Sequence, residues 1–260
     1  MHDRIFKTKA SWITLVCLFG TAMFSSFVSA SDKTVLVATA ANFRYAGEEI
    51  FDQFQNQTGV KVKASYGSTG KLIAQIEHGA PFDVLLSADD LSGQRLKESG
   101  LALSDSSFIY AHGRLVLWMP ENTSEPLTLE SLRLLNVQTL SIANPKTAPY
   151  GKAAAQALTK LKTYGLEPKR FLTGQSIAQA FQYVATGNAT LGLIALSQVI
   201  ATEQNQYSWL LIPQNFHLPL KQEALILSNS RNPSSAKLLT DFLSSDTAIK
   251  IMHKYGYEDI

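Results

Sequence analysis

The sequence has few of the residues that support covalent, redox or metal chemistry. Its 260 residues contain one cysteine, Cys17, and five histidines that form no pair at the spacing of metal ligands. A disulfide framework, a thiol nucleophile and a thiolate metal site are therefore not expected, nor is any cofactor. We interpret the histidines as structural or surface residues.

No apolar run is long enough for a membrane-spanning helix, which needs ~20 residues. The longest run, 12–24, follows a basic start and precedes a Val-Ser-Ala tripeptide. These features predict a signal peptide over 1–30, cut between Ala30 and Ser31, and therefore secretion through the inner membrane. A membrane anchor is the alternative; lipid attachment at Cys17 is discounted because a valine precedes it.

The sequence also lacks an excess of charge of either sign. The predicted leader holds three of the 23 Lys and Arg residues and one of the 21 Asp and Glu residues, which leaves 20 of each sign. This balance gives no support for binding to nucleic acid or to an anionic membrane. No heptad or exposed apolar repeat indicates assembly, so we expect a monomer.

What the sequence does have is a repeated alternation of short apolar strands and amphipathic helices. Residues 35–39, 60–66 and 82–87 read as strands, and each is followed by a segment with helical periodicity. This order predicts an α/β fold with an open parallel sheet. In such sheets, ligands bind beyond the carboxyl ends of the strands.

The pattern restarts after 114–119, an apolar strand with no helix directly before it. We predict that this strand and 224–228 are two hinge strands between two lobes. Lobe 1 is then formed by 31–112 plus 229–260, and lobe 2 by 113–228 with both hinge strands. One long amphipathic helix is expected over residues 234–255.

Four junctions between a strand and a helix carry small or polar residues. The first turn of a helix offers unpaired backbone N–H groups and the positive end of the helix dipole, which together favour anions. Two junctions lie in each predicted lobe, so closure of the lobes would bring them around one point. The junctions are Ala41/Asn42, Ser68/Thr69, Pro149/Tyr150 and Ser176/Ile177.

These junctions suit a small tetrahedral oxyanion, which accepts many hydrogen bonds. The Asn42 amide, the Thr69 and Tyr150 hydroxyls and the helix N–H groups supply donors without a Lys or Arg at the turn. Hydrogen bonds to a charged group contribute about 1.5–3 kcal/mol each, so five or six would give micromolar or tighter binding. Asn42 also has a simpler interpretation as the N-cap of the first helix.

A hydrolase is the alternative from a different functional class. Asp83, Asp89 and Asp90 could form paired catalytic carboxylates. However, carboxylates facing an anion site would repel its ligand, and capping or packing explains them as well. No Gly-x-Ser-x-Gly motif and no P-loop motif is present.

Several motifs resemble the periplasmic molybdate-binding proteins of ABC importers. They are ATAANF (38–43), GSTGKLIAQIEHGAPFDVLLSADD (67–90), HGRLVLW (112–118), ANPKTAPYGKAA (143–154) and TLGLIALSQ (190–198). The resemblance covers essentially the whole chain after the leader. It implies a type II periplasmic-binding fold whose two open sheets, flanked by helices, are joined by two hinge strands.

The resemblance also implies a function, which is capture of molybdate or tungstate without catalysis and delivery to a membrane permease. The ligand residues that it implies are Ala41, Asn42, Ser68, Thr69, Tyr150 and Ile177. Many members of the family carry Ser at the position of Asn42 and a ligand Tyr at the position of Ala195. The resemblance implies that Tyr150 supplies that hydroxyl from the opposite turn. Sulfate or thiosulfate remains the rival ligand, because a sequence does not give the radius of a pocket.

Overall fold

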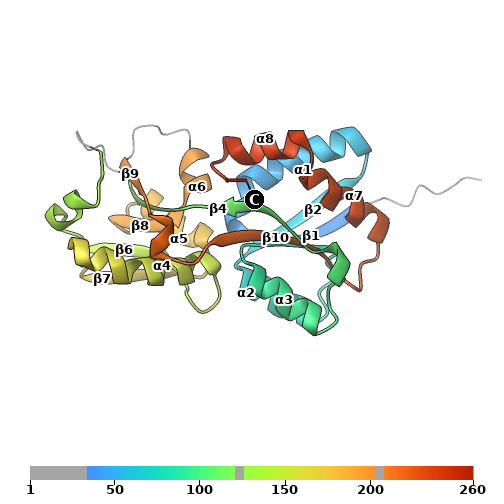
Figure 1. The fold of residues 1–260 in the computed structure, drawn as a ribbon, viewed down its shortest axis with the longest axis horizontal. Helices are drawn as coiled ribbons and strands as arrows, with labels where there is room; N and C mark the ends of the chain where they lie inside the picture. Colours follow the sequence, from blue (N-terminus) through green and yellow to red (C-terminus); the bar gives the residue numbers. More distant parts are fainter. Residues whose placement is uncertain (1–33, 121–125, 203–207, 260) are drawn as a thin grey trace, which may run out of the picture. The chain divides into compact units, whose positions relative to one another are not determined.

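The computed structural model describes residues 34–120, 126–202 and 208–259 (Figure 1). The predicted signal peptide and its cleavage site lie outside these ranges. The described strands form two five-stranded sheets, with the orders β2-β1-β3-β10-β4 and β7-β6-β8-β5-β9. We call the first sheet with the helices that cover it lobe 1, and the second sheet with its helices lobe 2.

The sheet of lobe 1 is parallel at one side and antiparallel at the other. Strand β1 pairs in parallel with β2 and β3, whereas β10 runs antiparallel to both β3 and β4. The strands are β1 Thr34–Ala40, β2 Lys61–Gly67, β3 Val84–Ser87, β4 Phe108–Gly113 and β10 Leu220–Ile226.

Helices cover both faces of this sheet because its strands are apolar on both sides. Helices α1 Arg44–Thr58, α7 Pro233–Leu243 and α8 Asp246–Lys254 pack through Ile50, Leu239 and their neighbours on one face. Helices α2 Thr69–Glu77 and α3 Asp90–Glu98 pack on the other face (Figure 1). Short 3-10 turns, η1 Ala41–Phe43 and η2 Ser104–Ser106, complete the lobe.

Lobe 2 repeats the same sheet design with different strands. Strand β6 pairs in parallel with β7 and β8, and β5 runs antiparallel to β8 and β9. Its strands are β5 Leu115–Met119, β6 Thr139–Ala143, β7 Arg170–Gly174, β8 Leu191–Ala195 and β9 Ser208–Leu211. Its helices are α4 Pro149–Leu161, α5 Ile177–Ala185 and α6 Leu196–Ile200, with 3-10 turns η3 Glu130–Leu134, η4 Lys162–Tyr164 and η5 Gln214–Phe216.

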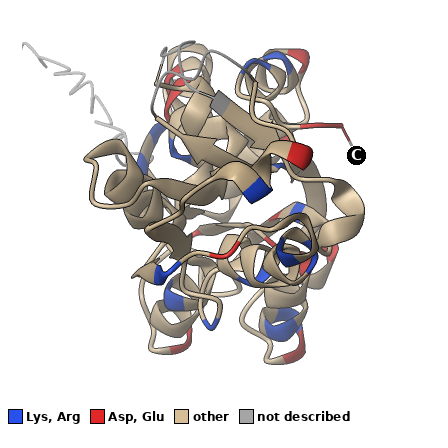
Figure 2. Ribbon diagram, turned by 90° about the vertical axis from the view of Figure 1, so that its left-hand side faces the viewer, with Lys and Arg blue, Asp and Glu red and all other residues tan. Residues whose placement is uncertain are grey.

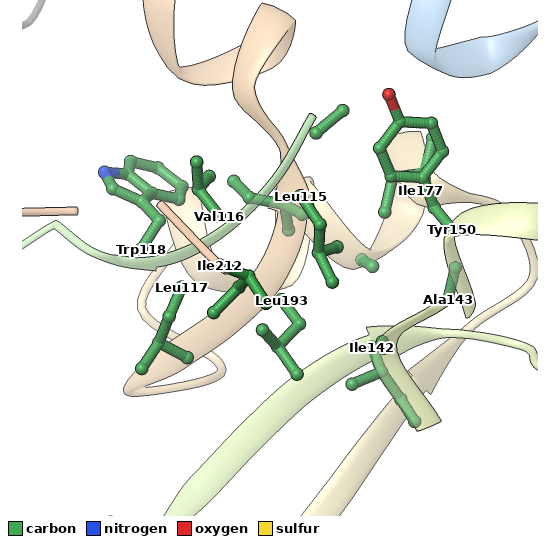
Figure 3. Close-up of a cluster of buried hydrophobic side chains, with 14 of the residues drawn as sticks. Leu115, Val116, Leu117, Trp118, Ile142, Ala143, Tyr150, Ile177, Leu193 and Ile212 are labelled. Carbon is green, nitrogen blue, oxygen red and sulfur yellow. The ribbon is translucent and has the colours of Figure 1, made fainter. Parts of the chain in front are cut away.

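The core of lobe 2 is built around β5 and the helices packed on it (Figure 3). Trp118 of β5 stacks on Phe181 of α5, with ring centroids 5.1 Å apart and planes 10° apart. Every residue of β5, β6 and β8 is buried, which accounts for the uninterrupted apolar runs in the sequence.

The structure differs from the sequence predictions at two places in lobe 1. Strand β10 covers the segment predicted as a hinge strand of lobe 2, but it is hydrogen-bonded to β3 and β4 within the first sheet. The predicted helix over 234–255 is two helices, α7 and α8, because Ser245 begins a new helix by accepting a hydrogen bond from the Ala248 amide at 3.2 Å.

Asp83 holds lobe 1 together at the base of β3. Its buried carboxylate accepts hydrogen bonds from the Leu36 amide, the Ser230 hydroxyl and the amides of Arg231 and Asn232, at 2.6–3.2 Å. This one side chain therefore ties β1 to the segment that precedes α7. Its role is structural, as the capping and packing interpretation requires.

We predict that Asp83→Ala lowers the free energy of unfolding by about 3 kcal/mol, because it removes a buried acceptor that receives four hydrogen bonds and leaves the Leu36 and Arg231 amides without it. Urea denaturation measures the change. Asp105→Ala, at a 3-10 turn with no buried residue, is the control and should change stability by less than about 0.5 kcal/mol. Equal stability of the two variants would contradict the role given to Asp83.

Candidate functional site

The residues that the sequence predicted as ligands lie at the carboxyl ends of strands or at helix N-termini, and all are buried. Ala41 and Asn42 form η1 directly after β1, and Ser68 and Thr69 follow β2. Tyr150 lies in the first turn of α4. Ile177 is the first residue of α5, after β7. The exposed fraction of each of the six residues is 4% or less.

Ser68 has a buried hydroxyl that the described protein groups do not satisfy. It occupies the N-cap position of α2, but its hydroxyl makes no hydrogen bond to the helix. Its Oγ is buried and has no hydrogen-bond partner among the described residues. By contrast, Asp89, Ser176 and Ser245 cap their helices through their side chains. A buried hydroxyl without a partner costs free energy, so an unfilled role for it is indicated.

The hydroxyl of Thr69 is oriented so that its proton stays available. Its Oγ1 accepts a hydrogen bond from the Ala88 amide at 3.1 Å, within a fully buried environment. A hydroxyl that accepts in this way retains one O–H to donate. Ser68 and Thr69 therefore place two O–H donors at the start of α2, where the helix dipole also favours an anion.

Tyr150 contributes a third hydroxyl from lobe 2. Figure 3 shows its O–H pointing away from the apolar cluster of this lobe. Burial raises the pKa of Tyr150 well above its usual value. The phenol therefore stays protonated, and able to donate, throughout the neutral pH range.

Gly113 makes room for the Tyr150 hydroxyl. A Cβ built on Gly113 would lie 2.2 Å from the Tyr150 hydroxyl oxygen and 3.0 Å from Nε2 of Gln222. Any other residue at the end of β4 would push the phenol away. The position of the Tyr150 hydroxyl thus depends on a glycine in lobe 1.

The Asn42 side chain does not have its predicted role, which was to donate a hydrogen bond to the ligand. Its Nδ2 donates to Oε1 of Gln222 at 2.7 Å and to the Tyr257 hydroxyl at 3.0 Å. Gln222 must present its oxygen here, because its own Nε2 donates to the Leu220 carbonyl. Both amide protons of Asn42 are therefore used within the protein. Its Oδ1 is buried and has no partner in the part of the chain that the structure describes.

Asn42 is not the N-cap of α1 either. The helix begins at Arg44 after the 3-10 turn, and Phe43 occupies the capping position. No local sequence pattern pointed to Gln222 and Tyr257, the two residues that hold the Asn42 amide. They come from β10 and from the segment after α8, far along the chain, so only the fold brings them to η1.

Residues at and beside the junctions make contacts between the two lobes. The Ser197 hydroxyl of α6 donates to the Asn42 carbonyl at 2.9 Å, and the Gly70 amide of α2 donates to the Thr147 carbonyl at 2.9 Å. One contiguous buried cluster includes small residues from lobe 1 and the junction residues of lobe 2: Ala40, Ala41, Ala88, Ala148, Tyr150 and Ile177. The structure therefore shows the lobes closed on each other.

Ile177 presents backbone rather than side-chain chemistry. Ser176 caps α5 by accepting from the Gln179 amide at 3.3 Å. The Ile177 carbonyl accepts from Nε2 of Gln198 at 3.3 Å, which fixes the start of α5 against α6. The amide of a first helical residue has no partner within its helix, so Ile177 can offer one N–H.

The three aspartates of the hydrolase hypothesis do not form a site. Asp89 caps α3 by accepting from the Ser92 amide at 2.9 Å, and Asp90 pairs with Lys221 at 2.8 Å. The hydrogen bond from Lys221 holds the pKa of Asp90 below its usual range. Asp83 is occupied by its four donors at the other end of β3. No catalytic carboxylate pair results.

Figure 2 shows Lys and Arg interspersed with Asp and Glu over the ribbon. Arg95, Lys146 and Lys152 line a groove of about 390 Å³ beside Gly70 and Thr147, together with Asp89. Arg44 instead pairs with Glu48 and lies over the Tyr66 ring. Within the described ranges, no group of His, Cys, Asp or Glu could hold a metal ion. The search for membrane spans over those ranges found no helix that is both long and apolar enough.

The Gln222 contact can be tested through stability. Gln222→Leu keeps the volume of the side chain but removes its hydrogen bonds to an Asn42 N–H and to the Leu220 carbonyl. We predict a loss of about 1–3 kcal/mol in the free energy of unfolding, measured by urea denaturation. Gln182→Leu, at an exposed position of α5, is the matched control. A loss no larger than that of the control would show that the Asn42 network is not fixed by Gln222.

Comparison with known proteins places the chain in a family. Residues 35–258 match the family model described as bacterial extracellular solute-binding protein. The chain is 40% identical to the molybdate-binding protein ModA of Azotobacter vinelandii, covering 94% of this chain and 96% of the relative. It is 41% identical to the ModA protein of Rhodobacter capsulatus, covering 86% and 87% of the two chains.

Comparison with solved structures points to the same group of proteins. The periplasmic molybdate-binding protein of Azotobacter vinelandii superposes with a TM-score of 0.78 at 33% identity, covering 87% of this chain and 99% of that one. The substrate-binding domain of a putative molybdenum ABC transporter from Clostridium difficile gives a TM-score of 0.66 at 25% identity, with the same coverage. The predicted two-lobed fold is thereby confirmed, and the chain belongs to the bacterial extracellular solute-binding proteins.

Proposed function

We propose that this protein captures molybdate between its two lobes and delivers it to an ABC importer. The observation that carries the proposal is the start of α2, where the Ser68 hydroxyl is buried without a partner and the Thr69 hydroxyl retains its proton. The relatives with 40% and 41% sequence identity are named as molybdate-binding proteins, which supports molybdate as the oxyanion.

Binding would rest on neutral donors from both lobes. Ser68 and Thr69 donate from lobe 1, and the Tyr150 hydroxyl and the Ile177 amide donate from lobe 2. At about 1.5–3 kcal/mol for each bond to a charged ligand, this set supports micromolar or tighter binding. The Asn42 side chain supports the site without donating to the ligand, and Ala41 leaves space beside it.

The proposal also covers the second ligand, the oligomeric state, the location and the partner of the protein. Tungstate has the shape and charge of molybdate, so a donor-lined site would bind both. We further propose that the protein acts as a monomer in the periplasm after removal of residues 1–30, that it carries no cofactor, and that it is not an enzyme. Its macromolecular partner would be the permease of the importer.

Calorimetric titration of the purified protein with molybdate, tungstate, sulfate and phosphate tests the function. We expect one-to-one binding of molybdate and tungstate at micromolar or lower Kd, and at least tenfold weaker binding of sulfate and phosphate. Equal affinity for sulfate would assign the protein to general oxyanion capture. Absence of binding to all four would contradict the proposal.

Two variants test the donors themselves. Ser68→Ala and Tyr150→Phe each remove one hydroxyl, and each should raise the Kd for molybdate by about 10- to 100-fold, from the loss of about 1.5–3 kcal/mol. Ser176→Ala is the matched control, because that hydroxyl is already used to cap α5. Unchanged affinity in both hydroxyl variants would remove these residues from the site.

A further inference from the structure

The two lobes meet through a backbone contact that lies directly beside the proposed donors. The Gly70 amide donates to the Thr147 carbonyl at 2.9 Å. Gly70 follows Thr69 in the first turn of α2, and Thr147 belongs to the turn that leads into α4 and Tyr150. The contact therefore joins the donor segment of lobe 1 to the donor segment of lobe 2.

The two backbones are tightly packed at this one point, beside the groove described above. A Cβ built on Gly70 would lie 2.9 Å from the Thr147 carbonyl oxygen and 3.1 Å from the Thr147 Cα. Outside its own helix and its chain neighbours, the three nearest atoms all belong to the Thr147 backbone. Backbone atoms cannot rotate away as a flexible side chain does, so further approach is blocked here.

The amide of Gly70 is also removed from the set of donors that an anion could use. It is an N–H of the first turn of α2, which would otherwise face a ligand. A second hydrogen bond between the lobes, from Ser197 to the Asn42 carbonyl, fixes their approach at another junction. Contacts within the protein, rather than the ligand, thus define where closure ends.

We propose that Gly70 and Thr147 form a closure stop that sets the separation of the donors in the two lobes, and so help to determine which oxyanion fits. The proposal rests on the proposed function and adds residues that determine specificity. When closure ends on a protein contact, a smaller anion such as sulfate cannot draw the donors closer. It then loses hydrogen bonds that molybdate makes, which provides discrimination without any charge in the site.

The substitution Gly70→Ala tests the stop. The added methyl group forces the lobes apart by a few tenths of an ångström, while alanine is more favourable than glycine within a helix, so lobe 1 keeps its fold. Gly67→Ala is the matched control at the end of β2, because its added methyl group meets only the Leu72 side chain of the same lobe.

For Gly70→Ala we expect at least a tenfold rise in the Kd for molybdate, measured by calorimetry. Stopped-flow kinetics should show the change in the dissociation rate, with the association rate within about twofold of the original, because the open form is unaltered. The melting temperature without ligand should be unchanged. Gly67→Ala should stay close to the unsubstituted protein in all three measurements.

Two results would overturn the proposal that Gly70 and Thr147 form a closure stop. One is a Kd for Gly70→Ala within twofold of that for Gly67→Ala. The other is a loss of affinity accompanied by an equal fall in association rate or in thermal stability, which would indicate damage to lobe 1. If the unsubstituted protein binds none of the oxyanions, the proposed function fails separately. Crystal structures of the closed form then decide the stop: the distance from the residue 70 amide to the Thr147 carbonyl must be longer in Gly70→Ala than in Gly67→Ala, and equal distances refute it.

Discussion

The need to satisfy buried polar groups at the ends of strands governs this structure. At the end of β1, the Asn42 carbonyl accepts from Ser197 of lobe 2 and from Tyr257 of lobe 1, each at 2.9 Å. The Asn42 amide is satisfied by Gln222 and Tyr257. Because unpaired groups would be costly at this depth, the network holds η1 rigidly and attaches lobe 2 to it.

Buried polar groups that lack a hydrogen-bond partner within the described residues are therefore informative. The Ser68 hydroxyl lies at a helix N-cap, where serine ordinarily bonds to the helix, and yet it has no partner in the described ranges. The Thr69 hydroxyl is held by an N–H donor and so presents its proton. A site that offers donors without cations suits a ligand that must be bound and later released to a transporter.

The same arrangement explains how a nearly neutral protein can select an anion. Lys and Arg lie among acidic residues over the elements seen in Figure 2, so long-range attraction has little part in recognition. Selection then depends on the geometry of O–H and N–H groups and on the distance between the lobes. Glycines at Gly70 and Gly113 are essential to that geometry, because each is approached closely by atoms of the other lobe.

The sequence by itself determined the alternation of strands and helices in the first half of lobe 1, the strand at 114–119 and the positions of the four junctions, because these depend on local periodicity, capping and turn chemistry. It did not indicate β4, β7 or β9, and it did not separate α7 from α8. It correctly marked Ser176 as the cap of α5 and 114–119 as the strand that begins the second sheet. Tertiary structure alone decided that β10 lies in the first sheet, since strand pairing is a choice between distant partners. It also decided that the Asn42 amide faces Gln222 and Tyr257 rather than a ligand, and that closure ends at Gly70 and Thr147. These contacts join residues far apart in the chain, and no local pattern encodes which distant atom will satisfy a given donor.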